Sequence, residues 1–298
     1  MGILRSLNNY LSLVKFSHTI FALPFAMVGF TLGIVHRLEK EEAWNWRAEF
    51  LPLIVKVLLC MIFARSAAMA FNRYLDRHFD ALNPRTARRE IPAGVIKPQH
   101  ALLFTIINSI LFVVTTYFIN TTVLYLSIIA LFVILFYSYT KRITALCHLV
   151  LGAGLALAPI GAYLSILPEF NWIPVLFALT VFTWVAGFDI IYALQDEEFD
   201  KEQRLHSIPA ALGKRGALMV SNGLHFLSAC FVITAGLEGG FGWIFWVGVT
   251  VFILLLIYQH MLVKPHDLSK VNMAFANTNG LASILFATFA IISFILQA

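Results

Sequence analysis

Long apolar runs alternate with short polar segments along the whole chain. The runs cover about 14–36, 50–71, 100–119, 122–140, 145–164, 172–191, 216–236, 241–262 and 272–296. Each is close to the roughly 20 residues that a membrane-spanning helix needs, and none has the alternating polarity of a barrel strand of about 10 residues. The pattern therefore predicts an all-α, polytopic transmembrane bundle of nine helices, forming one domain over residues 1–298.

Basic residues lie mainly on one side of this topology. If the N-terminus is cytoplasmic, the polar segments near 72–100, 141–145, 195–215 and 264–271 are cytoplasmic too. Together with the N-terminal segment they hold 17 of the 21 Lys and Arg residues, against 4 on the opposite side. This bias follows the positive-inside rule, so the net charge of +5 requires no nucleic-acid partner. We expect an integral protein of the bacterial inner (plasma) membrane with its N-terminus and basic loops in the cytoplasm.

Acidic residues are rare in such a chain, yet the segment "NRYLDRHFD" carries a regular set at the end of the second run. Asn72, Asp76 and Asp80 are spaced i, i+4, i+8. At about 100° per residue, these positions drift by only about 80° and share one face of a helix.

A second acidic set follows the sixth run, in "DIIYALQDEEFD". Asp189, Asp196 and Asp200 are spaced i, i+7, i+11, which on one continuous helix places them within about 40° of each other. Tyr192 lies at their flank. Both acidic sets therefore occupy the cytoplasmic ends of their helices.

The segments that follow the two sets are similar. Arg88, Arg89 and "EIPAG" follow the first set, and Arg204, His206 and "SIPAALG" follow the second. A duplication giving two four-helix halves plus a ninth helix would explain this similarity. It would also place the two acidic faces opposite each other at the mouth of one cavity.

Aligned carboxylates repel each other, so without cations the two sets destabilise the fold. Hard oxygen ligands point to Mg²⁺, which binds through a few carboxylates together with substrate phosphate. Cys60, Cys147 and Cys230 are scattered and show neither ligand spacing nor a disulfide pattern. The alternative is that the acids face cytosolic water or pair with nearby arginines, which we favour for Glu197, Glu198 and Glu202.

Both acidic segments resemble the paired signatures of the UbiA superfamily of intramembrane prenyltransferases, NxxxDxxxD and DxxYxxxDxxxD. The longer stretch "ARSAAMAFNRYLDRHFDALNPRTARREIPAG" is similar to the branch of 4-hydroxybenzoate polyprenyltransferases. The resemblance covers essentially the whole chain. It implies a Mg²⁺-dependent enzyme that transfers a polyprenyl group from polyprenyl diphosphate to a small aromatic acceptor.

The resemblance also implies roles for the acidic residues. The residues expected to hold Mg²⁺ and diphosphate are Asn72, Asp76, Asp80, Asp196 and Asp200, with Asp76 and Asp196 central to catalysis. Asp189 is expected to orient this site or the acceptor. Tyr192 stabilises an allylic cation with its ring face, or serves only in packing.

Four basic residues are expected to contact the diphosphate. Lys141 and Arg142 end the fourth run, Arg73 lies within the first motif, and Lys15 lies near the mouth of the first run. For each of them the alternative is simple anchoring at the membrane surface.

The sequence leaves four questions open. The acceptor is 4-hydroxybenzoate, leading to ubiquinone, or 1,4-dihydroxy-6-naphthoate, leading to menaquinone by the futalosine route. A cation-coupled secondary transporter is the alternative of another class, although transporter sites lie nearer the bilayer midplane than these acids do. The prenyl chain length and the oligomeric state have no signal in the sequence.

Overall fold

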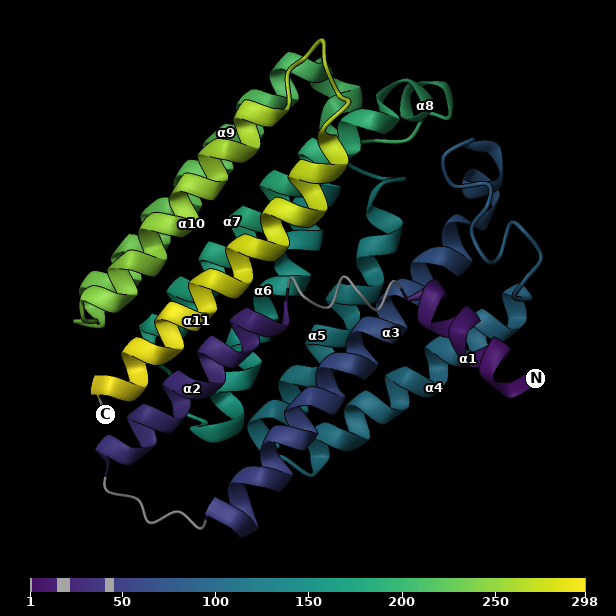
Figure 1. Ribbon diagram of the computed structural model, residues 1–298. Helices are drawn as coiled ribbons and strands as arrows, with labels where there is room; N and C mark the ends of the chain where they lie inside the picture. Colours follow the sequence, from purple (N-terminus) through teal and green to yellow (C-terminus); the bar gives the residue numbers. More distant parts are fainter. Residues whose placement is uncertain (1, 15–21, 41–45, 298) are drawn as a thin grey trace.

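The computed structural model describes residues 2–14, 22–40 and 46–297, and within these residues it contains helices and no β-strand. The helices are α1 (Gly2–Leu13), α2 (Leu23–Glu39), η2 (Trp46–Phe50), α3 (Leu51–Leu82), α4 (Pro98–Tyr117), α5 (Thr121–Thr140), α6 (Cys147–Ile166), α7 (Trp172–Ala193), η3 (Leu194–Asp196), α8 (Glu197–Glu202), α9 (Ile208–Glu238), α10 (Trp243–Leu262), η4 (Met273–Thr278) and α11 (Asn279–Gln297). Figure 1 shows the long helices side by side in one bundle.

Eight helical segments in the described residues are long and apolar enough to cross a membrane. They are 48–82, 98–117, 121–140, 147–166, 172–202, 208–238, 243–262 and 273–297. The remaining predicted span corresponds to α2, whose 17 residues extend about 26 Å and so fall slightly short of a bilayer core. The all-helical, polytopic membrane architecture is thereby confirmed, with eight span-length helical segments among the described residues where the sequence predicted nine.

Aromatic residues fill the centre of the bundle between α2, α7, α10 and α11. Phe25, Phe177, Trp184, Phe252 and Phe286 are all fully buried and pack in one cluster. The α2 helix approaches α6 so closely that a Cβ atom at Gly29 would lie 2.1 Å from the carbonyl oxygen of Pro159. Such close helix contacts through small residues are typical of membrane bundles, where packing replaces the hydrophobic effect.

The proposed division into two four-helix halves does not produce two separate packing units. The α2 helix packs against α6 and α11, and α3 packs against α4 and α5. The duplication itself stays a prediction.

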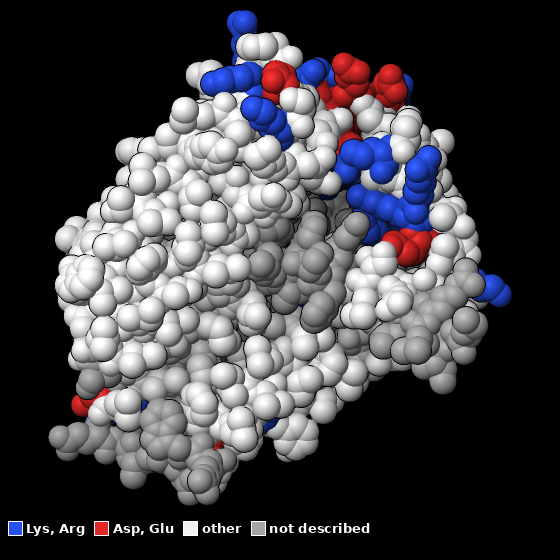
Figure 2. All heavy atoms as spheres, in the orientation of Figure 1, with Lys and Arg blue, Asp and Glu red and all other residues white. Residues whose placement is uncertain are grey.

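One end of the bundle collects the charged residues. There α3, α5 and α7 end, and the polar segment 83–97 and helix α8 cover them (Figure 1). Figure 2 shows Lys, Arg, Asp and Glu gathered at this end, above a broad band without them on the visible face. We call it the motif end, because it carries residues 72–97, 137–148 and 189–208.

Candidate active site

The first acidic set lies on the last turns of α3, which runs unbroken to Leu82. Asn72, Asp76 and Asp80 all line one cavity of about 160 Å³, as their shared helical face predicts. The amide of Asn72 donates a hydrogen bond of 2.9 Å to Oδ2 of Asp76, and Asp80 is buried with 6% of its surface exposed. The predicted common face is confirmed for this set.

The second acidic set does not lie on a continuous helix. The α7 helix ends at Ala193, a 3-10 turn covers Leu194–Asp196, and α8 begins at Glu197. The prediction of one helical face over residues 189–200 is therefore wrong, because each residue of a 3-10 turn advances about 120° and not about 100°. Asp189, Tyr192 and Asp196 nevertheless line the same cavity as the first set.

Asp200 occupies a different position from the other acids. It is fully buried and is not part of the cavity wall. Its Oδ2 accepts a hydrogen bond of 2.8 Å from the hydroxyl of Ser207, and its Oδ1 lies 2.7 Å from Nζ of Lys141. In this structure Asp200 holds Lys141, so any contact with a metal would require a change of partner.

Every acid of the two sets is paired with a Lys, Arg or His side chain that lies outside both sets. The pairs are Asp76–Arg142 at 2.8 Å, Asp80–Arg89 at 2.6 Å, Asp196–Arg85 at 2.5 Å, Asp200–Lys141 at 2.7 Å and Asp189–His148 at 2.7 Å. The expectation that the aligned carboxylates need metal to relieve their repulsion is thus corrected, because these bases already relieve it.

Four of the residues that contact the acids were not singled out as site residues from the sequence. Asn83 donates a hydrogen bond of 3.0 Å to Asp196, and Arg85 donates to the same carboxylate. Arg89 binds Asp80, and His148 binds Asp189. The basic residues of the segment "NPRTARR" were evident in the sequence, but the positive-inside rule already explained their presence. No sequence signal marked Asn83 or His148.

Four of the basic partners lie outside the membrane-spanning segments, and two of these, Lys141 and Arg85, have perturbed pKa values. Burial by itself lowers the pKa of the Lys141 ammonium, but the charge and hydrogen bond of Asp200 outweigh it and raise that pKa above its usual value. The pKa of Arg85 is likewise raised, because hydrogen bonds and charge from Asp196 outweigh its burial. Both side chains therefore remain cationic at neutral pH.

Tyr192 already has a cation beside its ring. The guanidinium carbon of Arg85 lies 5.3 Å from the ring centroid, and Nη1 of Arg85 donates a hydrogen bond of 3.0 Å to the phenolic oxygen. The ring also packs against Phe275, with 4.2 Å between centroids. The surroundings of Tyr192 thus combine cation binding with packing.

Arg73 and Asp80 each leave a buried polar atom without a hydrogen-bond partner among the described residues. These atoms are Nε of Arg73, whose side chain lines the cavity and is 5% exposed, and Oδ2 of Asp80. Lys15 lies outside the described residues. Buried polar atoms normally have partners, so an orphan donor and an orphan acceptor in one cavity indicate a polar ligand.

As they stand, no three His, Cys, Asp or Glu side chains in the described parts of the chain are close enough together to hold a metal ion. The donor chemistry nevertheless suits a hard cation, because the cavity wall presents carboxylate and amide oxygens and Oδ2 of Asp80 has no partner. A metal would bind here after some of the acids exchange their basic partners for it.

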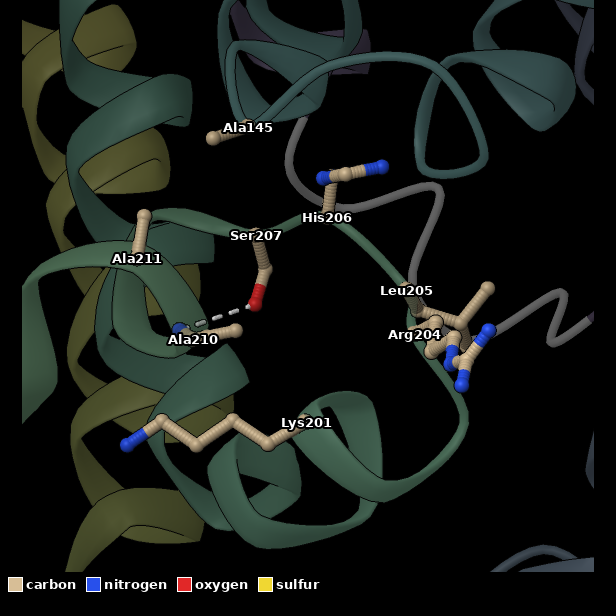
Figure 3. A pocket seen from close by; sticks show the side chains of 8 residues that line it. All are labelled: Ala145, Lys201, Arg204, Leu205, His206, Ser207, Ala210 and Ala211. Atoms are coloured by element: carbon tan, nitrogen blue, oxygen red, sulfur yellow. Dashed lines mark hydrogen bonds between the residues drawn. The ribbon is translucent and has the colours of Figure 1, made fainter.

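A second hollow, of about 450 Å³, lies beside the start of α9 (Figure 3). Its basic side chains, Lys201, Arg204 and His206, point in different directions, and no acid lines it. Lys201 is paired with Glu197 at 2.6 Å. The converging polar groups therefore belong to the smaller cavity between α3 and α7.

Comparison with known sequences gives consistent relatives. A 4-hydroxybenzoate octaprenyltransferase of Tolumonas auensis is 28% identical over 229 residues, covering 75% of this chain and 78% of the relative. A protein of the same name from Burkholderia multivorans is 29% identical over 248 residues, covering 80% and 83%.

Solved structures give the same fold. A UbiA homologue from Aeropyrum pernix, solved in its apo form, superposes with a TM-score of 0.80 at 30% identity, over 92% of this chain and 97% of that one. A UbiA homologue from Archaeoglobus fulgidus, bound to DMAPP and Mg²⁺, has a TM-score of 0.71 at 20% identity, over 97% and 99%.

The sequence pattern of the UbiA prenyltransferase family matches residues 38–289, which include both acidic sets and all of their basic partners. Bundle, cavity and relatives agree, and the chain belongs to the UbiA prenyltransferase family as a membrane-embedded prenyltransferase enzyme.

Proposed function

We propose that the protein transfers a polyprenyl group from polyprenyl diphosphate to a small aromatic acceptor, with Mg²⁺, at the cavity of the motif end. The observation that carries this proposal is that acids from two sets far apart in the sequence line one cavity, each paired with a basic side chain. These acids are Asp76, Asp80, Asp189 and Asp196. Such a site offers carboxylates to metal ions and cations to phosphate oxygens at the same time.

The comparisons support this chemistry. The curated relatives are named 4-hydroxybenzoate octaprenyltransferase, and the structures of the Archaeoglobus fulgidus homologue contain DMAPP or GPP with Mg²⁺, or Cd²⁺. For this chain we propose a polyprenyl diphosphate donor and an acceptor of the 4-hydroxybenzoate kind. The same chemistry on 1,4-dihydroxy-6-naphthoate is the second possibility for the acceptor.

The oxygen ligands of Mg²⁺ in this proposal are Asn72, Asp76, Asp80 and Asp196, joined by Asp200 if it releases Lys141. Bound Mg²⁺ neutralises the negative charge that builds on the diphosphate as it leaves. When the carboxylates turn to the metal, their basic partners become free to bind diphosphate oxygens. Lys141 and Arg142 take that role in our proposal, and Arg73 and Lys15 are the further contacts that we propose for the diphosphate.

The remaining residues act on the two organic groups. The bond between the first prenyl carbon and the diphosphate oxygen breaks, and its electron pair leaves with the diphosphate. The electron-rich ring carbon bonds to the prenyl carbon, and its proton passes to solvent. Tyr192 stabilises the allylic cation with its ring face, a contribution of about 1–2 kcal/mol when desolvated. Asp189 orients the acceptor by binding the hydroxyl group of the acceptor.

We further propose that residues 1–298 act as a single domain in the lipid bilayer of the bacterial inner membrane, with the motif end in the cytoplasm. Water-soluble acceptors then reach the cavity from the cytoplasm, and the prenyl tail lies in the apolar part of the bundle or in lipid. A cation-coupled transporter fits less well, because the acids lie at the ends of α3 and α7 and not at their midpoints.

The test uses purified protein in detergent with one polyprenyl diphosphate, Mg²⁺ and a panel of phenolic acids that includes both candidate acceptors. We expect one acceptor to give a prenylated product by mass spectrometry, with release of diphosphate that stops when Mg²⁺ is chelated. Absence of product with every acceptor, together with absence of Mg²⁺-dependent diphosphate release, would overturn the proposed function.

A further inference from the structure

His148 forms part of the cavity wall and connects three helices. It lies in the first turn of α6, with 3% of its surface exposed. Its Nδ1 lies 2.7 Å from Oδ2 of Asp189 on α7, and its Nε2 lies 3.4 Å from the backbone nitrogen of Ile208, the first residue of α9. The imidazole ring is thus held from both of its nitrogens.

These two contacts fix the tautomer of the neutral ring. A backbone N–H only donates, so Nε2 must accept the hydrogen bond from Ile208, and the ring hydrogen must lie on Nδ1. Nδ1 then donates to the carboxylate of Asp189. Ile208 lies at the start of α9, where the backbone N–H has no partner within the helix, so this contact also satisfies the helix end.

Asp189 differs from the other acids of the two sets in its partner. The other four are paired with Arg or Lys, whereas Asp189 is paired with the imidazole. Its Oδ2 is engaged by Nδ1, and its Oδ1 has no hydrogen-bond partner in the part of the chain that the structure describes. The imidazole therefore holds the carboxylate through one oxygen and leaves the other oxygen of Asp189, which lines the cavity, open to a donor.

We infer that His148 is a positioning residue, which holds Asp189 so that Oδ1 accepts a hydrogen bond from the hydroxyl of the aromatic acceptor. This inference rests on the proposed function. A phenolic hydroxyl donates to Oδ1, whereas the carboxylate of an aromatic acid is repelled by it. The pair therefore orients the acceptor with its hydroxyl toward Asp189 and its acid group away.

Three variants test the inference. His148→Leu removes the donor. His148→Asn keeps an N–H near the place of Nδ1. His225→Leu is the matched control, because His225 is also 3% exposed and makes a similar bond, with its Nδ1 2.8 Å from Nε2 of His260, but it does not line the cavity. Each variant is compared with wild type in steady-state kinetics for both substrates and in thermal unfolding.

We expect His148→Leu to lower kcat/KM for the acceptor by about 10- to 100-fold, as loss of a residue that orients a ligand commonly does. The KM for polyprenyl diphosphate should stay unchanged. His148→Asn should recover most of the lost activity toward the acceptor. His225→Leu should unfold at a lower temperature than wild type and leave the acceptor kinetics unchanged.

A binding measurement separates positioning from mere structural support. Wild type should bind the phenolic acceptor identified by the panel more tightly than its methyl ether, which cannot donate a hydrogen bond. His148→Leu should bind the two compounds equally, and His148→Asn should restore the preference.

Three results would overturn the inference. The first is wild-type acceptor kinetics in His148→Leu, and the second is a preference over the methyl ether that survives in His148→Leu. The third is equal loss toward both substrates without recovery in His148→Asn, which would make His148 a structural residue only. Wild type that is inactive with every acceptor is a different result, because it removes the proposed function and this inference with it before any variant is compared.

Discussion

Two clusters of buried polar residues in the described part of the bundle differ in the chemistry of their partners. The first surrounds the cavity of the motif end and consists of charged pairs. The second, which we call the closed network, lies between α7, α9, α10 and α11 and consists of Trp184, His225, Gln259, His260 and Asn279. It contains no acid, Lys or Arg, and none of its members lines the cavity or the second hollow.

The closed network mainly serves the backbone around the π-helical segment η4. Asn279 donates to the carbonyl oxygen of Phe275 at 2.9 Å and accepts from Nε1 of Trp184 at 3.0 Å. Gln259 donates to the carbonyl oxygen of Ala274 at 2.9 Å. A π-helical turn departs from the regular hydrogen-bond pattern, and buried carbonyl groups then need side-chain donors.

The difference indicates which group is structural and which is functional. Metal ions and diphosphate cannot replace the neutral hydrogen bonds to the backbone in the closed network, so these bonds stabilise a single arrangement of the helices. Buried ion pairs give little net stability, since desolvation offsets their attraction. In the ion pairs beside the cavity, the acid has the charge that would bind a metal ion, and the basic residue has the charge that would bind diphosphate. We therefore expect substitutions in the cavity to remove activity and substitutions in the closed network to remove stability.

The largest effect should come from Asp76→Asn and Asp196→Asn. Each substitution keeps the shape of the side chain but removes its charge, and an amide oxygen is a poorer Mg²⁺ ligand than a carboxylate. The turnover rate should fall by more than the ~10²–10³-fold that follows loss of a single transition-state donor. Product formation against Mg²⁺ concentration and thermal unfolding should show inactive but folded proteins.

Glu198→Gln is the matched control for these variants, because Glu198 is an exposed acid on the nearby helix α8. It should retain wild-type activity. Near-wild-type turnover of both aspartate variants at limiting Mg²⁺ would remove these residues from the mechanism and would leave the charged pairs as structural features.

Lys141→Ala should have the next largest effect. One charge-assisted contact to phosphate contributes roughly 1.5–3 kcal/mol, so use of polyprenyl diphosphate should weaken by roughly 10- to 100-fold. Saturation curves for the donor measure this effect. Lys201→Ala is the control, because Lys201 is exposed and lines the other hollow. Curves for Lys141→Ala that match those of the control would reduce Lys141 to an anchor at the membrane surface.

Asn279→Ala tests the closed network. It leaves the indole N–H of Trp184 and the carbonyl oxygen of Phe275 buried without this partner, and an unsatisfied buried group costs about 1–3 kcal/mol. The unfolding temperature should fall while the turnover of the folded fraction is retained. Thr288→Ala, at an exposed position of α11, should change neither quantity. Loss of turnover without loss of stability would contradict the division between the two groups.

Local pattern was sufficient for the fold and for the first acidic set. Runs of apolar residues predicted the helices, and regular spacing predicted the common face of Asn72, Asp76 and Asp80, because α3 continues past all three. The second set was harder, since "ALQDEEF" contains no Gly or Pro to mark the end of α7. There Asn83 and Arg85 bind Asp196 in the 3-10 turn, and they lie more than 110 residues away in the sequence.

The pairing of acids with bases could not be predicted for the same reason. Arg85 and Arg89 looked like topological charges, and Lys141 was expected to contact the diphosphate. Their pairing with Asp196, Asp80 and Asp200 is visible only in the folded structure. His148 is a single histidine in an apolar segment, and its contact with Asp189 joins helices α6 and α7.

Tyr192 lies where the two groups meet, because it contacts Arg85 of the cavity and also packs against Phe275 of η4. Tyr192→Phe should have the smallest effect on turnover, since it removes only the hydrogen bond from Arg85, worth about 1 kcal/mol, and keeps the ring. Tyr192→Leu removes the ring as well and should lower the turnover rate by a further factor of roughly ten, if the ring face stabilises the cation by about 1–2 kcal/mol. Single-turnover rates at saturating donor, with unfolding temperatures for both variants, separate the two contributions. A Leu variant that turns over as fast as the Phe variant but unfolds at a lower temperature would place Tyr192 on the structural side of the comparison, as packing for Phe275.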